Sequence, residues 1–162
     1  MQPTAPAATG TEPPVLKTPL PKRTCRGDVA ALHIPAADPN DTTWYTAHIH
    51  AWAHRQTDDT AEVADRVARI AVALVHNAHR WTRSGLPGGR AELEIVRGRF
   101  DLQVSVTDQG AAPCPSGVCS FPLARPRSGG LRTVEELSLY WDWEGGAATP
   151  ITVRALVDRR PL

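Results

Sequence analysis

The chain is poor in the features that mark several large classes of protein. It has three cysteines in 162 residues, an odd number too low for a disulfide scaffold, which favours a reducing compartment. Its 18 basic and 17 acidic residues leave a formal net charge of +1, so no bulk field attracts nucleic acid or a membrane. No apolar run approaches the ~20 residues that span a bilayer, and the N-terminus lacks the basic start and apolar middle of a signal peptide. We therefore expect a soluble cytoplasmic protein that binds neither nucleic acid nor membrane.

The length of the chain allows one domain with an ordinary core and a tail. Prolines crowd the first two dozen residues, which contain few large apolar side chains. Such a segment buries too little apolar surface to offset the entropy lost on folding. We expect residues 1–24 to be a disordered proline-rich tail and residues 25–162 to be the folded domain.

Hydrophobic periodicity and turn residues divide the domain into helices and strands. Strands are predicted at 29–34, 91–96, 100–106 and 151–157. Helices are predicted from about 42 to 55, from 60 to a turn at 83–89, and from 131 to 139, with a loop at 111–130. This order predicts an α+β fold, a two-layer sandwich with helices on one face of a mixed β-sheet.

Three motifs occur in order in the domain: Ala73-Leu-Val-His-Asn-Ala-His-Arg-Trp-Thr82, Val106-Thr-Asp-Gln-Gly110 and Ser128-Gly-Gly-Leu-Arg-Thr-Val134. A fourth segment, Ser138-Leu-Tyr-Trp-Asp142, corresponds to a family Ala-x-x-Trp-Gly. Together they resemble the GHKL (Bergerat) ATP-binding fold of histidine kinases, type II topoisomerases and anti-sigma-factor serine kinases. The resemblance is greatest to the short anti-sigma kinase-like proteins abundant in actinobacteria. It runs from about residue 29 to residue 158.

The resemblance implies a set of residues that bind Mg²⁺ and adenine. Asn77 would hold Mg²⁺ through its side-chain oxygen, together with the phosphates of ATP. Asp108 would accept a hydrogen bond from the adenine amino group, and Gly110 would let the backbone approach the base. Thr152 on the last strand and Thr82 are further polar candidates. The ordinary alternatives are a surface Asn and a common Asp-x-Gly turn after a strand.

The third motif implies a phosphate-binding turn. Gly129, Gly130 and Leu131 would bring backbone N–H groups at a helix N-terminus to the phosphates. The ordinary alternative is a plain Gly-Gly loop.

Three departures from the family pattern affect catalysis. The kinases' general-base Glu corresponds to Ala73, whose methyl group cannot accept a proton, and losing a general base typically lowers the rate about 100- to 10,000-fold. Trp81 replaces the family's His, and Ser128 replaces the first Gly of the phosphate-binding turn. We therefore expect no catalytic residue here, with ATP binding retained and phosphotransfer weak or absent.

The expected function is that of an ATP-binding regulator whose nucleotide state, ATP or ADP, tunes a protein contact. By family analogy the partner is a sigma factor or a STAS-type antagonist, and the chain could form a homodimer. Trp44 and Trp52 lie on the first predicted helix, which binds the partner or forms the dimer in related proteins. Two alternatives stay open: an active serine kinase with another base, and an interaction scaffold whose nucleotide pocket is filled by Trp81.

Two groups of potential metal ligands lie outside these motifs. Cys114 and Cys119 have finger-like spacing and could donate two thiolates to zinc, with Cys25 and a His completing a tetrahedron, but the second half of such a motif is missing. A reversible disulfide between Cys114 and Cys119 is the favoured alternative to a metal site. His50 and His54 are four residues apart, the spacing of a two-histidine metal face, yet no acidic third ligand stands between them. A partly exposed helix surface, which also carries His48, is the preferred interpretation.

Overall fold

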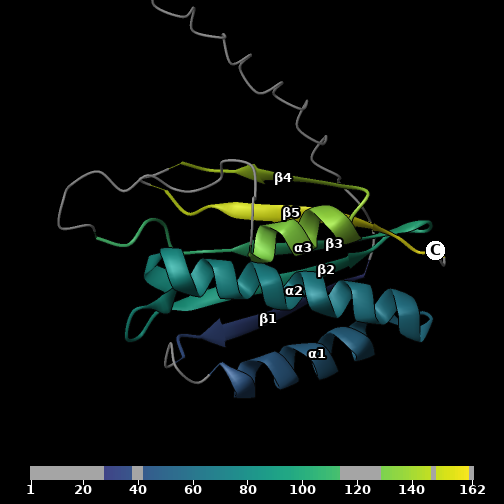
Figure 1. Ribbon diagram of the computed structural model, residues 1–162, viewed down its shortest axis with the longest axis horizontal. Helices are drawn as coiled ribbons and strands as arrows, with labels where there is room; N and C mark the ends of the chain where they lie inside the picture. Colours follow the sequence, from purple (N-terminus) through teal and green to yellow (C-terminus); the bar gives the residue numbers. More distant parts are fainter. Residues whose placement is uncertain (1–27, 38–41, 114–128, 147–148, 161–162) are drawn as a thin grey trace, which may run out of the picture.

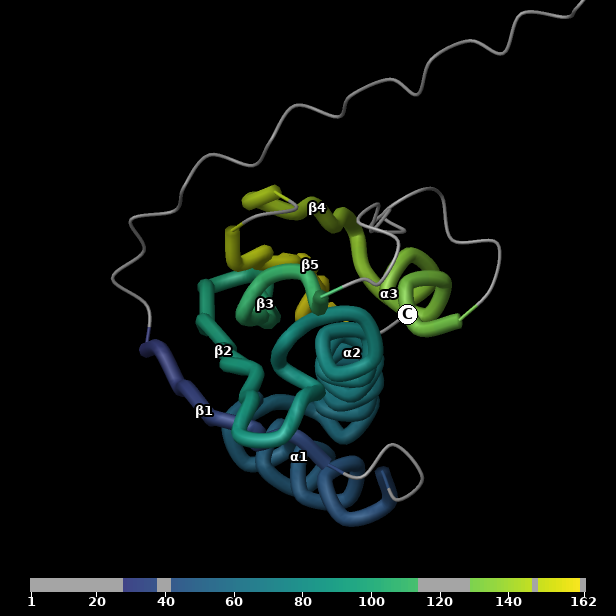
Figure 2. Tube along the Cα trace, turned by 90° about the vertical axis from the view of Figure 1, so that its left-hand side faces the viewer, coloured from purple at the N-terminus to yellow at the C-terminus, as the bar shows by residue number. Residues whose placement is uncertain are grey.

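The computed structural model describes residues 28–37, 42–113, 129–146 and 149–160. In this part of the chain, helices cover one face of a five-stranded sheet (Figures 1 and 2). The elements are β1 (Val29–Pro35), α1 (Thr43–Thr57), α2 (Ala61–Trp81), the 3₁₀ turn η1 (Arg83–Gly85), β2 (Arg90–Arg97), β3 (Asp101–Thr107), α3 (Gly130–Leu137), β4 (Tyr140–Glu144) and β5 (Thr152–Asp158). The α+β class and the two-layer arrangement agree with the prediction. The predicted tail, Cys25, Cys114, Cys119 and Ser128 lie outside the described residues.

The sheet has the order β1-β2-β3-β5-β4, and every neighbouring pair is antiparallel. The prediction of a mixed sheet is therefore wrong. Two helices separate β1 from β2, so the chain crosses the sheet twice and returns to the end where β1 finished, where Pro35 pairs with Arg90. β4 does run in the direction of β3, but β5 lies between them (Figure 1).

The strand β4 is missing from the sequence-based prediction, which extended the last helix to residue 139. The helix α3 ends at Leu137, and β4 follows within three residues. Trp141 and Trp143 are opposite Ala155 and Val153, on the face of the sheet that carries the helices. The alternation of tryptophan and acidic residues from 141 to 144 is the sequence signal that indicates this strand.

The helix α2 forms the centre of the core. The oxygen Oγ1 of its N-cap residue Thr60 accepts a hydrogen bond from Val63 N at 3.3 Å, which confirms the predicted helix start. Apolar residues recur at steps of three and four along α2, and all of them are buried: Val63, Val67, Ile70, Leu74 and Ala78. This stripe packs on the inward-facing residues of the sheet, among them Leu93, Ile95, Leu102, Val104, Val106, Val153, Ala155 and Val157.

The other face of the sheet is polar. Asp142 and Arg154 pair across β4 and β5 through two hydrogen bonds, Nε to Oδ1 at 2.9 Å and Nη2 to Oδ2 at 3.1 Å. Beside them, the hydroxyls of Thr107 and Thr152 are 2.8 Å apart. The helices therefore cover the apolar face of the sheet, and the polar face is left without a helix, as the alternation of apolar and polar residues along the strands indicates.

Protonation of His79 should destabilise the native state. Its Nε2 lies 3.3 Å from Ile34 O, its Nδ1 is buried without a hydrogen-bond partner among the described residues, and its ring meets Tyr45 edge-on. Burial lowers the pKa of His79 from its ordinary value of 6.5; the Ile34 hydrogen bond opposes this shift and nearby His76 adds to it. The unfolded chain then binds a proton that the native state resists, so the free energy of unfolding should fall as the pH drops below about 6.5. Urea denaturation from pH 7.5 to 5 would measure this fall.

The matched comparison is His79→Gln, whose amide can still donate to Ile34. The variant should lose part of the pH dependence, whereas His76→Gln, at an exposed position, should keep most of it. An unchanged slope in His79→Gln would contradict the assignment.

Candidate nucleotide-binding site

One end of the sheet brings together four elements that carry the predicted site. There β3 ends at Thr107 opposite the start of β5 at Thr152. The residue after α2, Thr82, forms an isolated bridge with Ala111. The start of α3 lies on α2, since a Cβ built on Gly130 would be 3.0 Å from Ala73 O. Residues far apart in the sequence are thus grouped at this end of the domain.

Asp108 is held firmly at the end of β3. It is 6% exposed, and its Oδ1 accepts hydrogen bonds from Gly110 N at 2.7 Å and Ile151 N at 3.0 Å. Burial raises the pKa of Asp108, an effect that these two hydrogen bonds oppose. Both bonds use the same oxygen, and no described residue donates to Oδ2. The carboxyl group therefore has a structural role in the turn and one oxygen left for a ligand.

Gly110 follows in a conformation that favours glycine, with φ of +84°. A Cβ built there would lie 3.4 Å from the carbonyl carbon and oxygen of Thr149. The close approach that this glycine permits is thus to the segment that leads into β5.

The turn after Asp108 is joined to the turn after α2. Arg83 N donates to Gly110 O at 2.9 Å, and Gln109 N donates to Ser84 Oγ at 3.0 Å. These bonds fix the position of the Asp108 turn relative to α2. Side chains from α2 and from the end of β3 are thereby held in one place.

Thr82, one of the additional candidates, is used to end α2. It is 2% exposed, its hydroxyl donates to Ala78 O at 2.7 Å, and its oxygen accepts from Ser84 N at 3.2 Å. The structure thus gives this hydroxyl a capping role.

Asn77 lies on α2 one turn beyond Ala73, towards the same end of the sheet. Its side chain is partly buried and forms no hydrogen bond with the described residues. The start of α3 lies beside the backbone of Ala73, four residues before Asn77 on the same helix. Among the residues that the structure describes, none engages the side-chain oxygen of Asn77.

The predicted phosphate-binding turn begins α3. Gly129 has φ of +90°, and a Cβ built on it would meet no atom of the described residues within 4 Å. Gly130 is the first residue of α3, and the side chain of Leu131 is buried in the core. Helix N-termini leave N–H groups without intrahelical partners, which suits anions.

Thr152 is not brought together with the other predicted residues. Its side chain is opposite Thr107 on the sheet face that carries no helix, whereas Asn77 and Gly130 lie on the helical side. The residue of this segment that meets Asp108 is Ile151, through two backbone hydrogen bonds. One-residue alternation along a strand decides which face a side chain reaches.

Trp81 lies at the surface and is 45% exposed, with the Arg80 guanidinium 5.0 Å from its ring centroid. Its ring therefore does not fill the interior of the site.

A second tryptophan, Trp143, lies near the site and was not predicted there. It is opposite Val153, which is opposite Val106, two residues before Asp108. These three residues share the helical face of the sheet, and Trp143 is 42% exposed. The sequence motif directed attention to Trp141, because the strand that places both tryptophans was not recognised.

The fold and the site define an α+β domain in which helices cover one face of an antiparallel sheet and several polar residues lie at one end of that sheet. No model of a known protein family matches the chain, and no curated protein is significantly similar to it. None of the helices in the described ranges is long and apolar enough to cross a membrane.

Proposed function

We propose that the protein is an ATP-binding regulator related to the GHKL proteins, in which phosphotransfer is weak or absent. The proposal rests on the environment of Asp108. Its carboxyl group is buried and accepts two backbone hydrogen bonds through Oδ1, so that Oδ2 would accept a hydrogen bond from a donor such as the adenine amino group. Asn77 and the start of α3 lie at the same end of the domain.

The residues present fit a magnesium nucleotide. The Asn77 amide would offer an oxygen ligand to Mg²⁺, which prefers oxygen and keeps several waters. The N–H groups of Gly129, Gly130 and Leu131 would face the phosphates at the start of α3. Bound Mg²⁺ would neutralise phosphate charge. The protein's own groups would hold the base and the phosphates in place.

The surroundings of Ala73 support a binding role over a catalytic one. Ala73 is 8% exposed, and its backbone carbonyl lies against Gly130. This position has no group that can accept a proton, and the nearest acidic residue before it on α2, Asp65, is engaged with His54 at 2.9 Å. Nucleotide binding would then act by stabilising the start of α3 against α2.

A protein partner follows from the same proposal. Trp44 on α1 is 45% exposed and is a natural interface anchor, whereas Trp52 is 8% exposed and belongs to the core. By family analogy the partner is a sigma factor or a STAS-type antagonist, and a second copy of the chain is a further candidate.

Calorimetric titration with ATP and ADP, with and without Mg²⁺, tests the proposal. We expect micromolar binding by the wild type and a loss of roughly tenfold or more in Mg²⁺-dependent affinity for Asn77→Ala, about 1.4 kcal/mol per tenfold. This change should leave the fold intact, because the Asn77 side chain has no hydrogen bond to lose among the described residues. The matched control is His76→Ala, an exposed neighbour on the same helix, which should bind like the wild type.

The alternatives give different results in the same assay. Absence of heat at millimolar nucleotide would indicate an interaction scaffold. Nucleotide binding accompanied by transfer of labelled phosphate to a partner serine would indicate an active kinase.

A further inference from the structure

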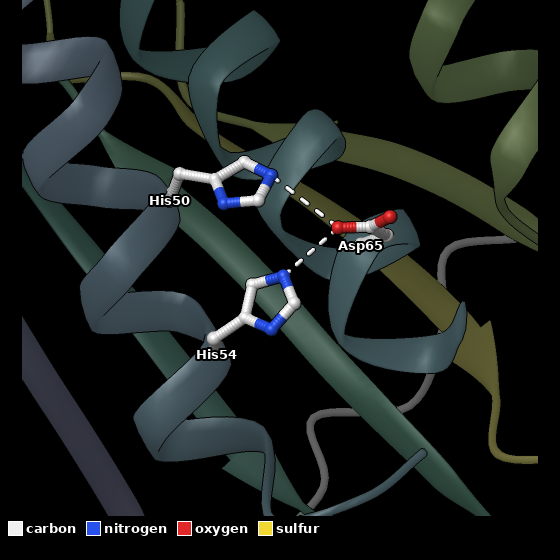
Figure 3. A group of neighbouring side chains, drawn as sticks. All are labelled: His50, His54 and Asp65. Carbon is white, nitrogen blue, oxygen red and sulfur yellow. Dashed lines mark hydrogen bonds and ion pairs between the residues drawn. The ribbon is translucent and has the colours of Figure 1, made fainter. Parts of the chain in front are cut away.

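Two histidines of α1 and one aspartate of α2 point towards one another (Figure 3). His50 Nε2 and His54 Nε2 lie 3.4 Å and 2.9 Å from the same oxygen, Asp65 Oδ1. The imidazole rings are stacked, with centroids 4.7 Å apart and planes inclined by 27°. Both rings thus direct the same nitrogen towards one carboxylate.

The spacing of these atoms suits a transition-metal ion. All three potential ligand atoms lie within 4.8 Å of one another. Zinc binds histidine nitrogen and carboxylate oxygen at about 2.0–2.2 Å, so tetrahedral ligands lie about 3.4 Å apart. Small side-chain rotations would bring the three atoms to this geometry.

The backbone that carries the ligands is well anchored. Ile49 and Ala53, which precede the two histidines, are fully buried, and so the i, i+4 pair is held on a fixed helix face. Asp65 lies between the buried residues Ala64 and Arg66 on α2. Core packing therefore places the three ligands before any metal binds.

The charge around the group also favours a cation. No lysine or arginine in the described part of the chain pairs with Asp65, whose ion-pair partners there are the two histidines. The side chains of His50, His54 and Asp65 are 45%, 34% and 60% exposed, so an ion could enter directly from solvent.

We propose that His50, His54 and Asp65 form a binding site for one divalent transition-metal ion of the zinc class. Imidazole nitrogens with a carboxylate suit zinc and its neighbours, whereas all-oxygen sites suit magnesium and calcium. With three protein ligands, water completes the coordination sphere. The ion would link α1 to α2 and stabilise the native state, which alone brings the three ligands together.

The test is a calorimetric titration with Zn²⁺ in a buffer that does not chelate it, without nucleotide. The full chain carries Cys25→Ser, Cys114→Ser and Cys119→Ser, because thiolates bind zinc themselves. We expect one equivalent of Zn²⁺ to bind. His54→Gln or Asp65→Asn should raise the Kd roughly tenfold or more, since even a change at a residue that only hydrogen-bonds to a metal ligand lowers metal affinity about 10- to 100-fold. His48→Gln, an exposed histidine on the same helix, is the matched control and should bind like the parent chain.

A second measurement identifies the ligands directly. In side-chain ¹⁵N spectra, Zn²⁺ should shift the Nε2 resonances of His50 and His54 and leave that of His48 in place. Equal zinc affinity in the parent chain and the His50→Gln/His54→Gln/Asp65→Asn variant, or no binding by the parent chain, would overturn the proposal. Neither result bears on ATP binding, so the two proposals fail independently.

Discussion

Gly85→Ala should destabilise the protein by at least about 4 kcal/mol, a large part of the ~5–15 kcal/mol that stabilises a typical domain. A Cβ built on Gly85 would lie 1.7 Å from His79 O and 2.7 Å from His79 C. Both contacts are with the backbone of the last turns of α2, so rotation of a side chain cannot relieve them. The turn would have to open, which would also disturb the hydrogen bond that Arg83 N donates to Gly110 O and the one that Ser84 Oγ accepts from Gln109 N.

Urea denaturation followed by circular dichroism measures this effect, with Gly88→Ala as the matched control. Gly88 lies in the same turn with φ of +79°, and a Cβ built there meets no atom within 4 Å in the part of the chain that the structure describes. Gly88→Ala should lower the free energy of unfolding by only about 1–2 kcal/mol, the penalty when a residue with a Cβ adopts the left-handed backbone conformation. The steric interpretation would be wrong if Gly85→Ala unfolded at the same urea concentration as Gly88→Ala.

Asp108→Ala should cost about 3 kcal/mol in the free energy of unfolding. It removes an acceptor that serves Gly110 N and Ile151 N, and hydrogen bonds to charged groups contribute about 1.5–3 kcal/mol each. Asp108→Asn keeps an oxygen at the Oδ1 position and should lose about 1 kcal/mol. Urea denaturation of both variants checks this order.

The same pair of variants separates stability from ligand binding. In Asp108→Asn an amino group replaces Oδ2 and cannot accept a hydrogen bond from adenine. This variant should therefore be folded yet bind ATP at least about tenfold more weakly, close to 1.4 kcal/mol. Undiminished ATP binding by a folded Asp108→Asn would remove Asp108 from the adenine site.

Local patterns were sufficient for most elements of the fold. The apolar stripe of α2 follows from helical periodicity, and Thr60 marks its start through a hydrogen bond to a residue only three positions away. The β2–β3 hairpin follows from alternation around Gly98, whose N–H bonds to Asp101 O at 2.8 Å. These features depend on neighbours in the sequence, and for that reason the sequence reveals them.

The pairing of strands and the sheet face that each side chain reaches were harder to predict. The prediction of a mixed sheet was wrong because strand order depends on pairing between segments that are far apart in the sequence. In the structure β5 pairs between β3 and β4. Thr152 was placed near adenine from its position on the last strand, yet a one-residue alternation turns it to the other face.

By itself the sequence determined the α+β class, the central helix and the hairpin, because helix and strand periods are local properties of the chain. Tertiary structure alone decided the antiparallel order of the sheet, the burial of Asp108 against Ile151 and the meeting of Asp65 with two histidines eleven and fifteen residues earlier. Each of these requires elements to pack through space, and the relative positions of packed elements depend on the whole core.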